Sequence, residues 1–427
     1  MISNTNPTSI TFETDVPTAV GSSSADGNVS MDDVIKDLRE RRQNVLNGGI
    51  NCIPWPFPRF RIDIPGIEQE QYVVVTAPTK CGKTQFASYV YIYHVLDYCF
   101  THPDQASVHI IYFCLEESQM RIKQRYISHL LYALDGIRIS PTDLRSTSAD
   151  FPLPEEILEK LASEKYRKRL AFFDECVQFE CEDTNPTGIL RVCEEYAKSV
   201  GDYKSYERRS RANHDVKVEV FQSYTPHDKK HYKMCFIDHL GLVDLERGMS
   251  LKQSMDKVSE YAVKYLRNRY KYTVVAIQQQ AMENEGLDAI KQKKIVPAVA
   301  TLGDTKYTAR DANLVIGLMD PSLFGLQSYQ GYLICDKDGK GLRNYGRFAH
   351  VLRGRDGEVG GIDPLFFDGA TCSFEELPKL DEFDELEKAY QKSNTLKSYK
   401  QQKRTAAMKA AVAILYYYAS KSWTTPK

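Results

Sequence analysis

Two features that would assign this chain of 427 residues directly to a functional class are missing. Its formal net charge is −1, so any nucleic acid must be held by a local basic surface and not by an overall basic excess. Its ten cysteines follow no zinc-ligand spacing, because Cys176 and Cys181 have no second Cys/His pair at a suitable distance. We therefore expect reduced thiols in a cytoplasmic compartment and no metal site built from cysteines.

The chain also lacks the segments that would direct it to a membrane. Its N-terminus has no charged start followed by an apolar stretch, which argues against a signal peptide. The longest apolar run, Ala410–Ala419, is far shorter than a membrane span. The hydrophobic share of 42% and the charged share of 26% are ordinary for a globular protein, so we expect a soluble chain without a membrane partner.

Composition divides the chain into four parts. Residues 1–30 are rich in Ser, Thr, Asn and Gly and predict a disordered tail. Residues 31–48 predict a linker helix, residues 49–376 one large α/β domain, and residues 377–427 a basic helical tail. Residues 202–230 interrupt the domain with a polar, charged segment that predicts an inserted hairpin.

Strand and helix patterns alternate along the large domain. The predicted strands are Gln71–Thr76, Val108–Leu115, Leu170–Asp174, Tyr232–Asp238, Thr273–Gln279 and Asn313–Met319. The helices predicted between them include Glu117–Leu134, Thr187–Ser199 and Leu251–Tyr270. Two late strands, Tyr332–Asp336 and Phe348–Leu352, are expected to pair antiparallel. Because helices separate most of the strands, the pattern predicts a mainly parallel sheet with helices on both faces.

A phosphate-binding pattern follows the first of these strands. Its residues are Ala77, Pro78, Thr79, Lys80, Cys81, Gly82, Lys83 and Thr84. Between a strand and a helix, such a loop presents backbone N–H groups and a helix N-terminus to phosphates. Lys83 would reach the β/γ phosphates and Thr84 would ligate Mg²⁺, so the expected cofactors are ATP and Mg²⁺. Ala77 stands where the strict motif has glycine, and a chance match on an ordinary strand–loop–helix is the alternative.

Polar side chains end three other strands and complete a candidate hydrolysis site. Asp238 is placed to hold the Mg²⁺ shell, although many strands end in aspartate. Glu116 is the candidate that orients the attacking water, whereas the adjacent Glu117 suits a carboxylate that complements a helix dipole. Gln279 is the candidate sensor of the γ-phosphate, with a merely polar strand end as the alternative.

Together these residues resemble the DnaB family of replicative helicases, which includes phage members, over about Asn51–Phe374. The family's P-loop also begins with Ala. Its Ser-Leu-Glu, whose glutamate is the catalytic base, is matched by Cys114-Leu115-Glu116, and its Ile-Asp-Tyr-Leu by Ile237–Leu240. Its sensor strand resembles Val274–Gln279. The resemblance implies a RecA-like P-loop ATPase core, a mainly parallel sheet flanked by helices, with a helical C-terminal tail.

A late segment carries the sharpest match. Arg353–Gly360 and Leu365–Gly369 resemble the family's Lys-Gln-Arg-Asn-Gly-Pro-Ile-Gly and Leu-Thr-Phe-Asn-Gly. The family's arginine there is a finger that acts on ATP bound by the neighbouring subunit, and it maps to Arg355. The family's lysine maps to Arg353, a change that keeps the charge and alters the geometry. A basic turn on the surface is the alternative.

A DNA-binding loop is implied by a further match. Gly303, Asp304, Thr305 and Lys306 align with the family's DNA loop, although the family's arginine is Gly303 here. Backbone N–H groups and a cation at these positions would hold a single strand. The lysines of the preceding loop are equally consistent with DNA contact and with a plain solvated loop; they are Lys291, Lys293 and Lys294.

The resemblance thus implies an ATP-dependent 5'-3' DNA helicase that forms a homo-hexameric ring and translocates on single-stranded DNA. Its implied partners are primase and a helicase loader, but the family's N-terminal primase-binding domain has no counterpart here. One alternative is a RecA/KaiC-like ATPase, of recombinase or signalling type, that does not unwind DNA. Another is an assembly protein with a relic nucleotide site.

Overall fold

The computed structural model describes residues 30–396 apart from 148, 150–151, 210–216, 282–294 and 356–359. The predictions for residues 1–29, for the lysines of the 291–294 segment and for the tail beyond residue 396 lie outside these ranges. No helix within them is long and apolar enough to cross a membrane.

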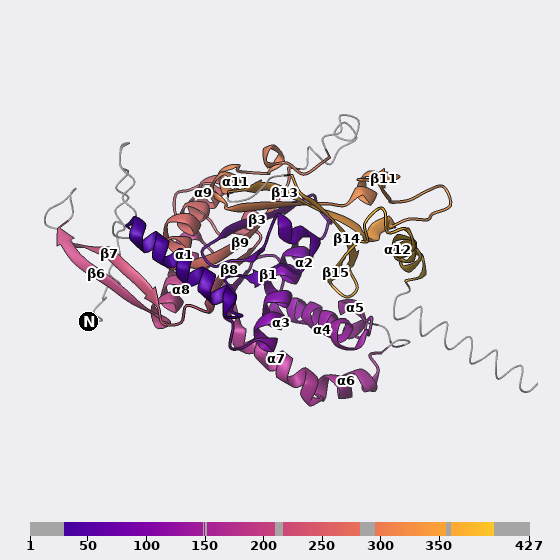
Figure 1. Cartoon of the computed structure of the whole chain (residues 1–427), viewed down its shortest axis with the longest axis horizontal. Helices are drawn as coiled ribbons and strands as arrows, with labels where there is room; N and C mark the ends of the chain where they lie inside the picture. Colours follow the sequence, from indigo (N-terminus) through magenta and orange to yellow (C-terminus); the bar gives the residue numbers. More distant parts are fainter. Residues whose placement is uncertain are drawn as a thin grey trace, which may run out of the picture.

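A nine-stranded sheet forms the centre of the described chain (Figure 1). In spatial order it contains β15 (Ser373–Glu376), β14 (Ile362–Asp368), β13 (Gly346–Gly354), β10 (Leu314–Met319), β3 (Tyr72–Ala77), β9 (Tyr272–Gln279), β8 (His231–Asp238), β4 (Ser107–Cys114) and β5 (Val177–Glu180). The strands from β10 to β5 are all parallel, and β13, β14 and β15 extend the sheet antiparallel. The mainly parallel sheet expected from the alternation of strands and helices is confirmed.

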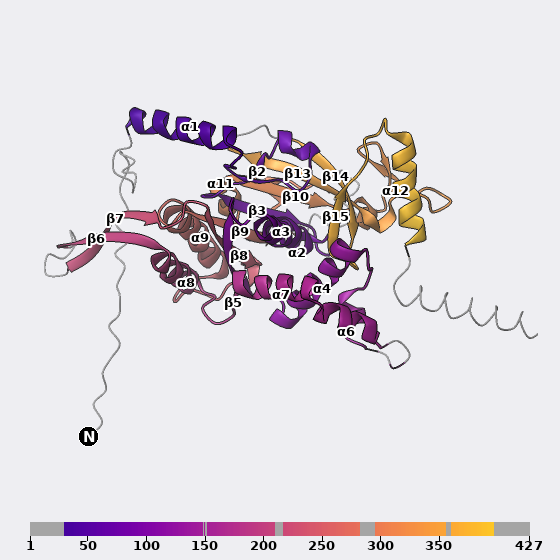
Figure 2. The same cartoon turned by 60° about the horizontal axis from the view of Figure 1, so that its bottom comes forward.

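Helices cover both faces of the sheet (Figures 1 and 2). One face carries α2 (Lys83–Ser88), η2 (Tyr89–Tyr93), α3 (His94–Thr101), α4 (Gln119–Asp135) and α7 (Glu164–Cys176). The other carries α8 (Pro186–Ser199), α9 (Leu251–Tyr261) and η4 (Ala262–Arg267). Shorter helices are α5 (Pro141–Leu144), α6 (Glu155–Ala162) and α11 (Tyr307–Asp311).

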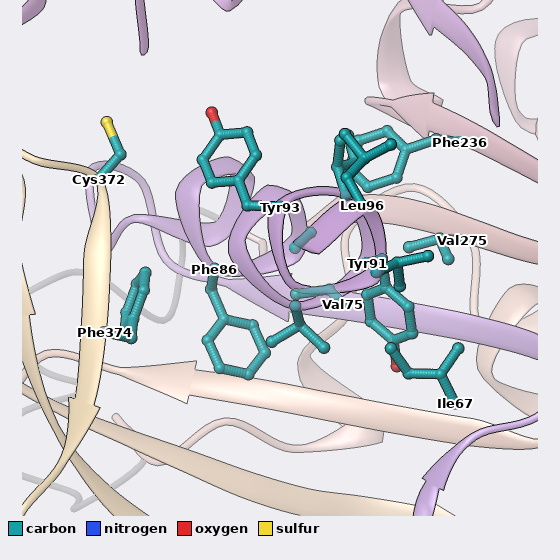
Figure 3. Close-up of a cluster of buried hydrophobic side chains, with 14 of the residues drawn as sticks. Ile67, Val75, Phe86, Tyr91, Tyr93, Leu96, Phe236, Val275, Cys372 and Phe374 are labelled. Atoms are coloured by element: carbon teal, nitrogen blue, oxygen red, sulfur yellow. The ribbon is translucent and has the colours of Figure 1, made fainter. Parts of the chain in front are cut away.

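Two large apolar cores result, one on each side of the sheet, and a third, smaller cluster forms at β13 and β14. Successive side chains of a strand point to opposite faces, so Val73 and Val75 belong to one core and Tyr72 and Val74 to the other. Figure 3 shows the first core, where Phe86 packs near Val75. Each fully buried aliphatic or aromatic side chain contributes about 1.5–3 kcal/mol, so these cores fix the strand order that brings the site residues together.

Two predicted elements project from this body. The helix predicted as a linker is α1 (Met31–Leu46), which begins with a Ser30–Asp33 capping box. The insertion is the hairpin of β6 (Gly201–Arg209) and β7 (Lys217–Pro226), which extends outward in Figures 1 and 2. The helical character of the C-terminal segment is confirmed for α12 (Phe383–Thr395).

The predicted strand at Leu170–Asp174 is wrong, because these residues lie within α7 and the strand begins at Val177. The apolar run there is one face of a helix: Tyr166, Phe173 and Cys176 are all buried and recur with helical spacing. Four consecutive apolar or aromatic positions satisfy a strand pattern and a helix pattern equally, and here the helix also covers the sheet.

The expected pairing of the two late strands is also wrong. The structure has β12 (Tyr332–Leu333) paired with β11 (Ser328–Tyr329), whereas β13 pairs with β10 and β14. The chain turns after β12 because the carboxylate of Asp336 accepts the N–H groups of Asp338 and Lys340, at 2.9 Å and 2.8 Å. Both late strands do pair antiparallel, but with other strands and not with each other.

Candidate nucleotide site

The phosphate loop lies between the end of β3 at Ala77 and the start of α2 at Lys83. Gly82 has φ +95°, a left-handed conformation that a side chain rarely adopts, and a Cβ there would lie 3.2 Å from the Phe367 ring. Lys80 is also left-handed, at φ 62°. The loop therefore has a defined, partly strained conformation at the N-terminus of a helix, which is where phosphates bind.

Thr84 and Asp238 meet next to this loop. The Thr84 hydroxyl donates to the Asp238 carboxylate at 3.1 Å, and the buried Tyr112 hydroxyl donates to its other oxygen at 3.0 Å. Burial raises the pKa of Asp238 to about 6, and the hydrogen bonds of Tyr112 and Thr84 oppose that shift. A hydroxyl and a carboxylate held together beside a phosphate loop are the donor set that fits Mg²⁺ bound with ATP.

Glu116 and Glu117 have different surroundings. The Glu117 carboxylate forms an ion pair with Arg125 of α4. The Glu116 side chain is 48% exposed, and its carboxylate lies 4.0 Å from the ring of His239, the residue after Asp238. Burial lowers the pKa of His239, which favours the neutral imidazole. Glu116 is therefore the carboxylate that remains available to a water molecule near the Asp238 end of β8.

Gln279 reaches the phosphate loop directly. Its side-chain amide donates to the Thr79 hydroxyl at 2.6 Å, and Gln279 is level with Ala77 in the sheet. An amide in contact with the loop is placed to respond to a bound γ-phosphate. The adjacent Gln278 points into the protein, and its amide donates to the carbonyls of Gly303 and Thr305 at 2.6 Å and 2.8 Å.

The Gly303–Lys306 loop is thereby tied to the end of β9. The Gly303 N–H donates to the Gln279 carbonyl at 3.1 Å. Thr305 is buried, and its hydroxyl bonds to Asp256 of α9, so its side chain is already engaged within the protein. Asp304 and Lys306 are exposed. Of the predicted DNA-binding side chains, Lys306 is the one that offers an exposed cation.

Arg355 lies at the opposite end of the strands from the phosphate loop, and Arg353 lies part-way along them. Arg353 pairs with Val315, which is level with Val74, and the Arg355 N–H donates to the carbonyl of Asn313, the residue before β10. Arg355 is thus level with the start of β3, about 17 Å along the sheet from its end at ~3.3 Å per residue. Neither arginine reaches the nucleotide site of its own chain.

Both arginines donate to main-chain carbonyls of α11. The Arg353 guanidinium donates to Ala309, and that of Arg355 to Asp311, at 3.1 Å and 2.9 Å. The Arg355 residue is nevertheless exposed, so its guanidinium is accessible from outside the subunit.

Sequence reasoning missed three residues that shape the site, namely Tyr112, Gln278 and Arg347. Tyr112 stands inside an apolar strand and gives no polar signal until β4 and β8 are aligned. Gln278 belonged to the predicted run of glutamines, but its inward direction follows only from strand alternation. Arg347 donates to the carbonyl of Cys81 at 2.7 Å from a strand 266 positions later, and no local pattern marks that contact.

The fold is shared with solved ATPase domains. A structure described as an ATPase domain matches 82% of this chain over 100% of its own length, with a TM-score of 0.52 and 14% sequence identity. A DnaB-like replicative helicase, solved in connection with its interactions with primase, matches 82% of this chain over 67% of its own length, with a TM-score of 0.53 and 14% identity.

No protein-family model and no curated protein sequence matches the chain. The structural likeness establishes the fold, which is the RecA-like core found in the ATPase domains of DnaB-like helicases. The expected fold class is therefore confirmed.

Proposed function

We propose that this chain is an ATP hydrolase of the DnaB replicative type, which assembles into a homo-hexameric ring and moves on single-stranded DNA. In each site Lys83 and Thr84 bind the nucleotide phosphates and Mg²⁺, Asp238 holds the metal shell, and Glu116 orients the attacking water. Gln279 contacts the phosphate loop as a sensor. Bound Mg²⁺ supplies charge neutralisation at the transferring phosphate.

The observation that carries this proposal is the placement of the two halves of the site at opposite ends of the strands. The phosphate loop, Thr84 and Asp238 lie at one end, and the proposed finger, Arg355, lies at the other. A finger that is remote from its own site serves only the site of a neighbouring subunit. A head-to-tail contact of that kind closes into a ring when the rotation permits.

The surface of α1 supports assembly. None of its residues is buried, yet it presents several apolar side chains to solvent: Met31, Val34, Ile35, Leu38, Val45 and Leu46. An amphipathic helix whose apolar side chains are left uncovered by the described part of the chain is suited to dock on a second copy. We assign to α1 the role of the linker that joins neighbouring subunits.

The loop at Gly303–Lys306 supplies the DNA contact in this proposal. Gln278 and the Gly303 N–H join it to β9, the strand whose end carries Gln279. A change at the γ-phosphate felt by Gln279 therefore reaches the loop through a short, hydrogen-bonded route. Lys306 would contribute an electrostatic, largely sequence-independent contact with the strand. Primase and a helicase loader are the partners that this assignment suggests, and a cytoplasmic location follows from it.

The test is unwinding of a forked DNA duplex with ATP by the parent chain and by Arg355→Ala and Glu116→Gln. We expect unwinding by the parent and none by either variant, with the ring still assembled. If the parent hydrolyses ATP in response to single strands but does not separate a fork, the chain belongs with RecA/KaiC-like ATPases. If it hydrolyses no ATP, the site is a relic.

A further inference from the structure

Arg347 is a buried arginine with an unusual set of partners. It lies near the start of β13 and is 5% exposed. Its Nε donates to the carbonyl of Cys81 in the phosphate loop at 2.7 Å, and its Nη1 pairs with the Asp320 carboxylate at 2.8 Å. The same Nη1 also donates to the carbonyls of Asn344 and Gly346, at 2.9 Å and 2.8 Å. The guanidinium is therefore held from several directions.

The contact with Cys81 fixes the direction of one peptide group. A trans peptide is planar, so the carbonyl of Cys81 and the N–H of Gly82 point in opposite directions. With the carbonyl bound to Arg347, the Gly82 N–H is turned to the other side of the loop. Phosphate loops bind anions through such N–H groups. Glycine resists rotation of its peptide group less than any other residue. A hydrogen bond from outside the loop therefore restricts the Cys81–Gly82 peptide more than it would restrict a peptide without glycine.

We propose that Arg347 is a positioning residue of the nucleotide site, which holds the Cys81–Gly82 peptide in the orientation that accepts phosphate. This inference rests on the proposed function and deepens it, because it assigns the geometry of the loop to β13, a strand in the antiparallel part of the sheet. Arg347 does not touch the nucleotide. It acts through the main chain of Cys81.

Asp320 keeps the arginine in place. It is 2% exposed, and burial raises its pKa while the charge of Arg347 opposes that shift. Its other oxygen accepts from the N–H and hydroxyl of Ser322, at 3.0 Å and 2.6 Å. Removing Arg347 alone would leave a buried carboxylate unpaired, which destabilises the fold for a reason unrelated to the phosphate loop. A useful variant must neutralise both partners.

A second buried ion pair provides a matched control. The Arg138 guanidinium binds Asp368 through two hydrogen bonds, of 2.6 Å and 2.8 Å, and the side chains are 11% and 7% exposed. This pair joins the segment after α4 to β14, and both of its residues lie outside the Ala77–Thr84 phosphate loop. Replacing it changes the charge and burial of the protein as replacing the Arg347 pair does.

The experiment compares Arg347→Met with Asp320→Asn, as a double variant, against the double variant Arg138→Met with Asp368→Asn. The readouts are the Kd of a fluorescent N-methylanthraniloyl-ATP with Mg²⁺, kcat at saturating ATP, and the unfolding temperature. We expect the Arg347 pair variant to bind nucleotide at least about ten-fold more weakly, the loss of one hydrogen bond to a charged group. Its kcat should stay within about three-fold, because the restraint serves ground state and transition state alike.

The control variant should keep the parent's Kd, whatever its unfolding temperature. Arg347→Lys should bind with intermediate affinity, because a lysine reaches either Asp320 or Cys81 and does not span both as the guanidinium does. An unchanged Kd in the Arg347 pair variant, or an equal loss in the control, overturns the inference. A parent chain that binds no nucleotide overturns the proposed function itself, so the two failures are distinguishable.

Discussion

The two ends of the central strands differ in how far folding alone completes them. At the carboxyl end, Asp238 is buried and bound by Tyr112 and Thr84, and the phosphate loop is held by Arg347 and Gln279. At the amino end, Arg355 is exposed, and within the described residues its guanidinium donates to the main-chain carbonyls of Arg310 and Asp311. The first half of the site is thus built by intramolecular packing, whereas we propose that a neighbouring subunit completes the second half.

This difference separates two kinds of variant. Substitutions at the carboxyl end should impair a subunit whether or not it is assembled. Substitutions at the amino end, or on α1, should leave a subunit folded and able to bind nucleotide but unable to work within a ring. Nucleotide affinity and turnover, measured together, therefore assign a variant to one end or the other.

The largest effect is expected from Arg355→Ala. Losing an arginine finger costs about 10³–10⁵-fold in kcat, because the transition-state charge is no longer neutralised. Binding of ATP and the unfolding temperature should not change, since Arg355 is remote from its own site. Arg310→Ala, at a neighbouring exposed arginine on α11 whose side chain is 64% exposed, is the control and should keep activity. Normal turnover by the Arg355 variant would show that Arg355 is not an arginine finger.

The second-largest expected effect is on kcat, and it distinguishes Glu116 from the adjacent Glu117. Glu116→Gln should lower kcat by about 10²–10⁴-fold, the usual contribution of a general base, with little change in nucleotide affinity. Glu117→Gln should instead lower the unfolding temperature, because it weakens the ion pair with Arg125, and should keep kcat within a few-fold. ATP turnover measured at saturating nucleotide decides between them. Equal losses in both variants would remove Glu116 from its assigned role.

A third prediction concerns assembly. Leu38 on α1 is 60% exposed, so Leu38→Glu should change the free energy of unfolding by no more than about 0.5 kcal/mol. It should nevertheless dissociate the ring in sedimentation experiments and abolish turnover that depends on the neighbour. Lys36→Glu, on a side chain that is 77% exposed, is the control. An intact ring in the Leu38 variant would mean that α1 does not join subunits.

The smallest expected effect is on the pH dependence of stability, and it concerns the region where η1 (Arg59–Ile62) packs against β14. Asp363 is buried there, and burial raises its pKa to about 8, with Glu376 and Asp63 adding to the shift and Arg59 opposing it. Between its ordinary pKa and about 8 the folded chain holds a proton that the unfolded chain has released. The free energy of unfolding therefore falls as the pH rises through this range.

Asp363→Asn cannot titrate, so it should flatten this dependence and raise the unfolding temperature at about pH 8 more than at about pH 5. Thermal unfolding across that range measures the effect. A variant with the parent's pH profile would show that Asp363 is ionised in the folded chain.

The elements that sequence predicted well are those whose signals are local. The strand before the phosphate loop is a continuous apolar run, as a strand buried on both faces must be, and the loop motif marks its own position. Helix α1 and the hairpin also followed from caps and composition. The carboxyl ends of parallel strands meet at one edge of a sheet, which is why the sequence alone places Asp238 near Thr84.

The parts that sequence did not predict depend on long-range pairing. Leu170–Asp174 has an ambiguous apolar pattern, and only packing against the sheet selects a helix. The contact of Arg347 with Cys81 requires β13 to lie beside β10, a pairing between distant segments. Which side of β9 each glutamine faces likewise depends on the register of that strand.

We propose that one active site combines Lys83 of one subunit with Arg355 of the next, and a mixture of two inactive variants tests this sharing. Lys83→Ala lacks a working phosphate loop but keeps its finger, whereas Arg355→Ala keeps the loop and lacks the finger. In rings assembled from both, some sites unite an intact loop with an intact finger. We expect that ATP turnover, absent from each variant alone, returns in the mixture. A mixture as inactive as its components would contradict it.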